Sequence, residues 1–177
     1  MEKGFTYHFQ MVLLFLFNLA LNTCGNVADV ADPEAQSRSA TMCRLHLPSA
    51  RHAIFSAFNW PELTGYSSLG LLHTRDHTLP WTDGDPAPGF RYTFGLPEGC
   101  VLPRYLHDYS RFGLGVSATG QILYANNSPV ILCYTRDISN PAYWSPQLYD
   151  AVTFELGARL NMAKNGKASL TNSPRLS

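Results

Sequence analysis

The sequence predicts an α+β fold: a discontinuous helical bundle formed by the N- and C-terminal segments, with an inserted small antiparallel β unit. Apolar residues recur at helical spacing near both ends of the chain. Between these segments the spacing changes to two residues, which is typical of strands. We therefore expect a helical bundle domain over residues 1–89 and 138–163, an inserted β domain over 90–137, and a flexible basic C-terminal tail over 164–177.

The first 25 residues allow two interpretations. Lys3 and the apolar run 11–17 resemble a secretory signal, and the stretch 21–24, which ends in a cysteine, has the outline of a lipoprotein cleavage site. The alternative is a buried helix that ends at Gly25, because glycine commonly follows the last turn of a helix. As a helix, residues 9–24 would reach only about 24 Å, short of a hydrocarbon core of ~30 Å. On these grounds alone both interpretations stay open.

A second helix is expected to begin at Asp32 and Pro33, since an aspartate cap followed by proline is a common helix start. Its apolar stripe consists of Met42, Leu45, Ala53, Ile54, Ala57 and Phe58. Pro48 interrupts the stripe, which predicts a kink or two abutting helices. The helix should end near residues 59–61.

The middle of the chain is read as turns followed by strands. Residues 63–72 suggest a short helical turn region, and residues 82–89 an exposed loop rich in Gly and Pro. Strands are expected at 90–94, 100–106, 113–116, 121–124 and 130–134. Gly and Asn turns separate the later strands, so these form a small antiparallel unit.

Helix returns near the C-terminus. Asn140-Pro141 and Ser145-Pro146 are both cap-plus-first-turn signals. The predicted apolar face consists of Leu148, Val152, Leu156 and Leu160, widened by Ala151, Phe154 and Ala158. No acidic residue follows Glu155, whereas four cations do: Arg159, Lys164, Lys167 and Arg175. We expect the last residues to be disordered until a partner binds them.

Composition narrows the classes of function. The 177 residues carry 13 Lys plus Arg and 13 Asp plus Glu, so the formal charge is zero, which argues against a general nucleic-acid-binding protein. Charged residues make up only 15% of the chain, against the usual fraction of ~25%. The weakly polar surface that results suggests an assembled state.

Candidate catalytic and metal sites are weak. Cys43 and His46 could share one helical face as nucleophile and base, but no third group can be named to orient them. His73 and His77 could hold a metal if helical, without the glutamate of a metalloprotease motif. The chain's cysteines are Cys24, Cys43, Cys100 and Cys133. No two of them form a CxxC pair, so buried free thiols are favoured over one or two disulfides. We therefore predict no catalytic, metal or cofactor site, and a structural protein rather than an enzyme.

Four ordered stretches resemble the tail tubular protein A family, the head-to-tail adaptor (gatekeeper) of short-tailed bacteriophages. They are Asn18–Gly25, Cys43 to Trp60, Phe90–Cys100, and Arg136-Asp137 followed by Tyr143 to Leu160. The resemblance as a whole covers roughly residues 10–163. The first stretch resembles the first-helix ending of the family, so the resemblance favours an uncleaved core helix over a signal peptide.

The resemblance implies a virion protein at the head-tail interface, assembled in the host cytoplasm. Such proteins form rings of about twelve identical subunits, which join the portal protein to the tail nozzle or tail tube. Double-stranded DNA passes through the ring without sequence recognition, and no cofactor or membrane is involved. Arg159, Lys164, Lys167 and Arg175 are the hypothetical portal-binding residues. The alternative is a secreted or lipid-anchored bacterial binding protein with an N-terminal signal.

Overall fold

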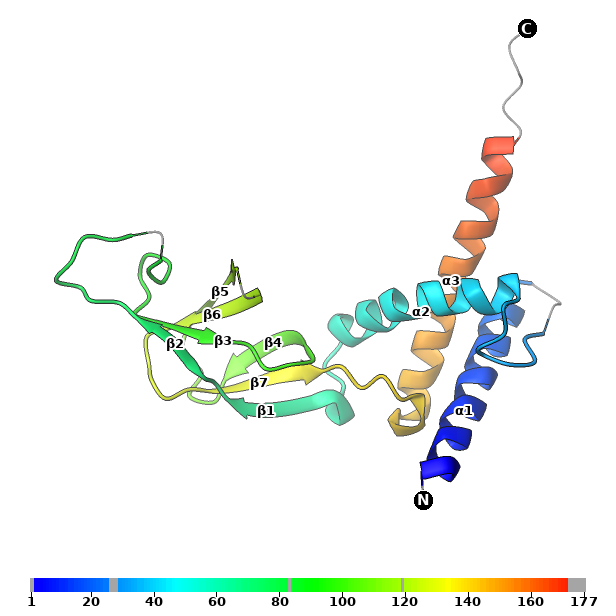
Figure 1. The fold of residues 1–177 in the computed structure, drawn as a ribbon, viewed down its shortest axis with the longest axis horizontal. Helices are drawn as coiled ribbons and strands as arrows, with labels where there is room; N and C mark the ends of the chain where they lie inside the picture. The colour runs from blue at the N-terminus through cyan, green and yellow to red at the C-terminus, as the bar shows by residue number, and fades with distance from the viewer. Residues whose placement is uncertain (1, 26–28, 83, 119, 172–177) are drawn as a thin grey trace, which may run out of the picture. The chain divides into compact units, whose positions relative to one another are not determined.

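The computed structural model describes residues 2–25, 29–82, 84–118 and 120–171 of the chain (Figure 1). Within them lie three α-helices and two antiparallel sheets, so the predicted α+β class is confirmed. Contacts divide the chain into a helical unit, Met1–Phe58 with Ile138–Ser177, and a β unit, Asn59–Asp137. The later boundary matches the expected one, whereas the earlier lies at residue 58 instead of 89.

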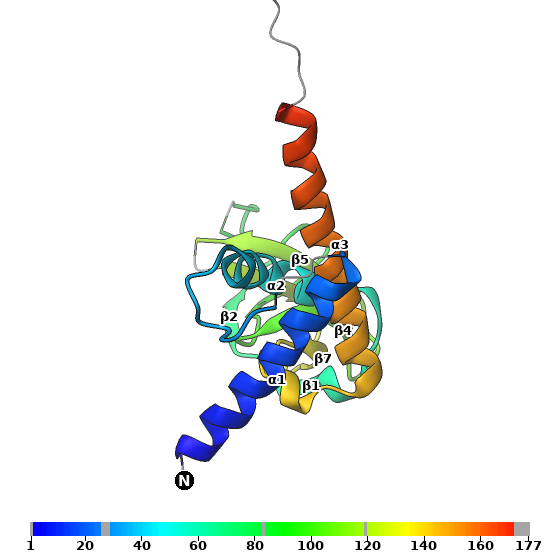
Figure 2. The same cartoon turned by 90° about the vertical axis from the view of Figure 1, so that its right-hand side faces the viewer.

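In the helical unit, the other helices pack against the last helix of the chain. The elements of this unit are α1 (Glu2–Thr23), α2 (Arg38–Ala57), the 3₁₀ turn η2 (Pro141–Tyr143) and α3 (Pro146–Thr171). Both α1 and α2 pack against α3 (Figures 1 and 2). The predicted α3 stripe forms the centre of this packing, because Leu148, Val152, Leu156 and Leu160 are all buried. Phe154 was assigned to the same face but is exposed.

The N-terminal apolar run forms α1, a packed helix of this unit. Its buried residues are Leu13, Leu16, Phe17, Ala20 and Leu21. Gly25 has φ +66° and follows the last turn, as a helix stop requires. The Asn18 amide accepts from the Val30 N–H at 2.7 Å and donates to the Val30 carbonyl at 3.0 Å, which ties the chain after α1 back to the helix. No helix among the described residues is long and apolar enough to cross a membrane.

The second helix begins later than predicted. Asp32 accepts from the Glu34 N–H at 2.9 Å and so caps a turn, while Ser37 is the N-cap of α2 and accepts from the Ala40 N–H. Pro48 lies inside one continuous helix and not between two. The buried face consists of Ala40, Cys43, Leu47, Ala50 and Phe55. The predicted stripe was wrong, since none of its six residues is buried: Leu45, Ala57 and Phe58 are exposed, and Met42, Ala53 and Ile54 are half-buried.

The β unit contains two strands that the sequence did not reveal. Residues 63–72, expected to be a helical turn region, instead end the 3₁₀ turn η1 (Pro61–Leu63) and form β1 (Thr64–Ser68) and part of β2 (Leu71–Thr74). Because these residues form strands, the β unit begins at Asn59 and not at the expected residue 90. The predicted strands are present as β3 (Tyr92–Gly95), β4 (Cys100–Leu106), β5 (Phe112–Ser117), β6 (Gly120–Ala125) and β7 (Ile131–Arg136).

The strands form two sheets around one core. The first has the order β1-β7-β4 and the second β2-β3-β6-β5, all antiparallel (Figure 1). The core contains residues from both sheets: Leu69, Phe94, Leu106, Leu123, Ala125, Val130, Leu132 and Tyr134. In β7 the four residues Leu132 to Thr135 are all buried, so this strand is covered on both faces and its burial does not alternate.

The helix α3 continues to Thr171, beyond the expected start of a disordered tail at residue 164. In both views its last turns extend past α2 (Figures 1 and 2). The sequence from 164 onward lacks apolar periodicity, because this part of the helix is not needed to cover the core.

Candidate functional site

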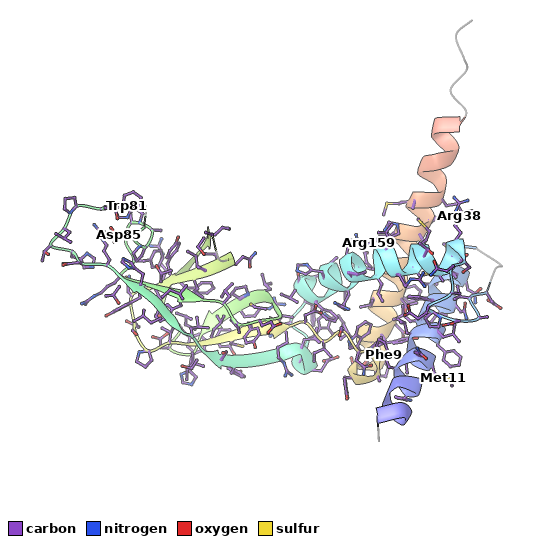
Figure 3. The ribbon with its side chains drawn as sticks, viewed as in Figure 1. Phe9, Met11, Arg38, Trp81, Asp85 and Arg159 are labelled. Carbon is purple, nitrogen blue, oxygen red and sulfur yellow. The ribbon has the colours of Figure 1, made fainter. Side chains whose placement is uncertain are left out.

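The outer side of α1 carries an apolar ridge, formed by Met11, Phe15 and Leu19. These residues recur every fourth position, so they lie on one helical face, and they are 50%, 66% and 44% exposed. Met11 is labelled in Figure 3. No charged residue occurs between residues 4 and 28, so nothing on α1 itself interrupts this α1 ridge with charge. An apolar surface of this kind is typical of a protein–protein contact.

Further large apolar side chains are exposed on α3. Phe154 is 63% and Met162 65% exposed. Both lie on the helix that packs against α1 and α2, yet neither side chain is used in the core of the unit. With the exposed Leu45 of α2, all three helices of the unit present large apolar side chains to solvent.

A pocket of about 320 Å³ opens between the end of α1, the start of α2 and the second half of α3. Its lining residues are Leu21, Cys24, Arg38, Ser39, Met42, Leu160, Ala163 and Lys164. Most of these are apolar or small, while Arg38 and Lys164 supply two positive charges. Arg38, labelled in Figure 3, is also the first residue of α2, where the helix dipole adds partial positive charge. The pocket suits an apolar side chain that is flanked by a carboxylate.

The four predicted portal-binding cations occupy different surroundings. Arg159 donates from Nε to Glu155 Oε1 at 2.7 Å and from a terminal nitrogen to the Ser49 hydroxyl at 3.1 Å, so it joins α3 to α2 and is no part of a tail. Lys164 lies at the pocket. Lys167 belongs to the last turns of α3, and Arg175 lies outside the described residues. The sequence pattern did not single out Arg38. This residue lines the same pocket as Lys164 only because α2 packs against α3.

Cys43 and His46 show no catalytic arrangement. The Cys43 thiol is buried in α2, and this burial raises its pKa to about 12. A nucleophilic cysteine requires the opposite shift, toward thiolate at neutral pH. All four cysteines are unpaired, in agreement with the favoured prediction, and Cys43 and Cys133 are the buried ones.

At pH 8, we expect Cys43 of the native protein to react with a thiol reagent about a hundredfold more slowly, or more, than after unfolding in urea. The raised pKa also has a consequence for stability. The buried thiol keeps its proton in the folded chain up to a pKa of about 12, so its contribution is complete below its ordinary pKa and is lost as the pH rises toward 12. Mass spectrometry of labelled peptides measures the rate. Labelling of native Cys43 as fast as in the unfolded chain would contradict this account.

The loop between β2 and β3 is organised by Asp85 (Figure 3). This carboxylate accepts from the Thr82 N–H at 2.8 Å and from its hydroxyl at 3.1 Å, and it lies 3.1 Å from His73 Nε2. The Trp81 indole N–H donates to the Pro86 carbonyl at 3.0 Å. These bonds explain the role of His73 in the loop. Among the described residues no group of three or more His, Cys, Asp or Glu side chains could hold a metal ion. His73 lies in β2 and His77 in a turn, so the helix that their predicted metal site required is absent there.

Replacing Asp85 with Ala should accelerate proteolysis of the loop at neutral pH several-fold without changing the melting temperature, because the loop lies outside the core. The hydrogen bond from the Thr82 backbone N–H lowers the pKa of Asp85, and the hydrogen bond with His73 lowers it further. The ordering is therefore present above the usual carboxyl pKa of about 4 and is lost as the pH falls through the lowered value. The exposed Glu98, replaced with Ala, is the control. Equal cleavage rates in both variants would contradict the role of Asp85.

No family model and no curated protein matches this chain.

Proposed function

We propose that this protein is a head-to-tail adaptor of a bacteriophage, which assembles into a ring and connects the portal protein to the tail nozzle or tube. The four stretches that resemble the tail tubular protein A family support this proposal. The function requires a rigid unit that contacts identical neighbours, and three packed helices from both ends of the chain are suited to that task. The β unit would then be the part directed to the tail.

The observation that carries the proposal is the α1 ridge. Met11, Phe15 and Leu19 lie on a helix that is packed in the unit, yet their side chains remain exposed. Exposed apolar side chains of this size lower the solubility of a protein unless another protein covers them. The small fraction of charged residues in the chain also favours a surface that another protein covers. In a closed ring every subunit covers one flank of its neighbour, so identical copies supply the cover without a second protein.

We further propose that the C-terminal end of α3 and the residues after it contact the portal. This region contains Lys164, Lys167 and Arg175, and no acidic residue follows Glu155. The last turns of α3 lie beyond α2, so they can enter a partner without unpacking the helical unit (Figure 1). Many copies would engage together, so a modest contact per subunit gives strong attachment overall.

Sedimentation of the protein with the portal of the same phage tests this proposal. The expected result is stoichiometric co-sedimentation of full-length protein with portal, and strongly reduced binding after truncation behind Ala163. A full-length variant with Lys164, Lys167 and Arg175 all replaced by Gln separates loss of charge from loss of length. Undiminished binding of the truncated chain would overturn the portal-contact role of the tail, and failure of the full-length protein to bind would overturn the adaptor function.

A further inference from the structure

Two arginines lie beside each other where the β2–β3 pair opens into its long loop. Thr74 of β2 is paired with Tyr92 of β3, and the Arg75 N–H donates to the Arg91 carbonyl at 2.9 Å. The pairing therefore continues one residue beyond the strands and brings Arg75 next to Arg91. Like charges on facing strand positions destabilise a sheet when nothing compensates them.

Both arginines line an open hollow of about 420 Å³ in the β unit. Its other lining residues are Thr74, Asp76, His77 and Thr78. Asp76 is the acidic residue in this lining, but its Oδ1 already accepts from the Thr78 N–H at 2.9 Å and from the Thr78 hydroxyl at 2.7 Å. Among the described residues, no ion pair joins Asp76 to Arg75 or Arg91. Asp76 offsets one of the two arginine charges at most, so the hollow keeps a net positive charge.

The side chain of Arg75 has a buried donor without an acceptor. Its Nε has no hydrogen-bond partner among the described residues, although it is shielded from solvent. A buried donor of a charged group that stays unpaired is costly, and such groups in folded proteins usually bind water or an ion. The orphaned Nε thus points to a ligand that brings an acceptor to this position.

Arg91 is held in place from one side. Its guanidinium carbon lies 5.3 Å from the centroid of the Tyr92 ring, a cation–π contact that restricts the side chain. One guanidinium with a free buried donor and a second that is oriented by an aromatic ring form a prearranged pair. Less entropy is lost when a ligand binds groups that are already ordered.

We propose that the Arg75–Arg91 hollow binds a phosphate group, with Arg75 Nε and the Arg91 guanidinium donating to its oxygens. The planar guanidinium fork matches phosphate oxygens, and two forks from neighbouring strands offer donors in more directions than a planar carboxylate can accept. The phosphate comes from free inorganic phosphate or from a nucleic-acid backbone. The site lies within the β unit and is independent of ring assembly, so it stands or fails separately from the adaptor function.

The test uses the full chain and three probes: inorganic phosphate, a labelled 20-base-pair DNA duplex, and polyglutamate. Phosphate is expected to raise the melting temperature relative to chloride at equal ionic strength, since a ligand that binds only the folded state stabilises it. The duplex is expected to bind with strong salt dependence. The double variant R75Q/R91Q should lose the phosphate-dependent shift and weaken duplex binding about tenfold or more. Its salt slope should also fall by about two, one for each lost phosphate contact.

The matched control is Arg136→Gln, which removes one charge from the other sheet of the same unit. This control should retain the phosphate-dependent rise in melting temperature and the duplex affinity of the wild type, whatever its own melting temperature without phosphate. If the double variant does not fold, the single variant Arg91→Gln, at an exposed position, answers the same question. A phosphate shift without duplex binding supports the site with free phosphate as ligand, and duplex binding that phosphate competes away supports it with a nucleic-acid backbone. Equal responses of the double variant and the wild type, absence of any wild-type response to phosphate and duplex, or a preference for polyglutamate would overturn the proposal.

Discussion

Replacing Gly157 with Val is expected to destabilise the protein by about 1–3 kcal/mol, the usual cost of forcing extra atoms into a packed site. Gly157 lies in α3 where α1 makes its closest approach. A Cβ at this position would overlap the Thr23 hydroxyl and lie 3.0 Å from the Ala20 carbonyl oxygen. Thr23 also donates to the Ala20 carbonyl at 2.7 Å, so neither group can move away cheaply. Urea denaturation of both proteins measures the change in the free energy of unfolding.

The matched control is Ala158→Val, one position along the same helix and exposed. It introduces the same β-branched side chain, so it should cost less than about 0.7 kcal/mol, which is the range of helix propensity alone. Equal destabilisation in both variants would show that the α1–α3 contact is not as close as described.

Replacing Phe15 with Glu is expected to abolish self-association while leaving the subunit folded. Phe15 is 66% exposed at the centre of the α1 ridge, so its side chain is not part of the core. A buried aromatic residue at the centre of an interface typically contributes about 2 kcal/mol or more, and a carboxylate in its place would be desolvated without a partner. Native mass spectrometry measures the loss of oligomer, and circular dichroism checks the fold.

Gln10→Glu is the control for this variant, because it places the same charge on the same helix beside the ridge. It should retain the oligomer. A Phe15→Glu protein that assembles as the wild type does would exclude the α1 ridge from the subunit interface.

Most of the regular structure could be predicted from periodicity. The α3 stripe from Leu148 to Leu160 repeats every fourth residue, and Gly and Asn turns mark the ends of the later strands. These patterns are clear because α3 has one buried face and the strands are short segments bounded by turn residues. They gave the α+β class and the position of the second domain boundary.

The strands β1 and β2 could not be predicted in this way. All four residues of β2 are exposed, so no alternation exists. In β1, Gly65 lies under Tyr134 and Arg136 of β7, where a Cβ would collide with the Arg136 side chain. The side chains that cover Gly65 belong to the partner strand, and the sequence of β1 itself contains only small and polar residues beside the exposed Tyr66. Pairing with distant strands, not local pattern, determines both elements.

The start of α2 illustrates a competition between two valid signals. Two places in the sequence fit a helix start: the pair Asp32 and Pro33, and Ser37. The structure uses Asp32 for a turn and Ser37 for the helix, a choice that depends on how the intervening residues pack. The candidate sites depend on the fold for the same reason. Arg38 and Lys164 line one pocket from two different helices, and Arg75 lies beside Arg91 only through the β2–β3 register.

Electron microscopy of the protein mixed with its portal tests the proposed ring of this chain most directly. The expected images show a ring of adaptor subunits at the tail-facing end of the portal, lost in the Phe15→Glu variant and retained in Gln10→Glu. Portals that remain bare in the presence of excess wild-type protein would contradict the claim.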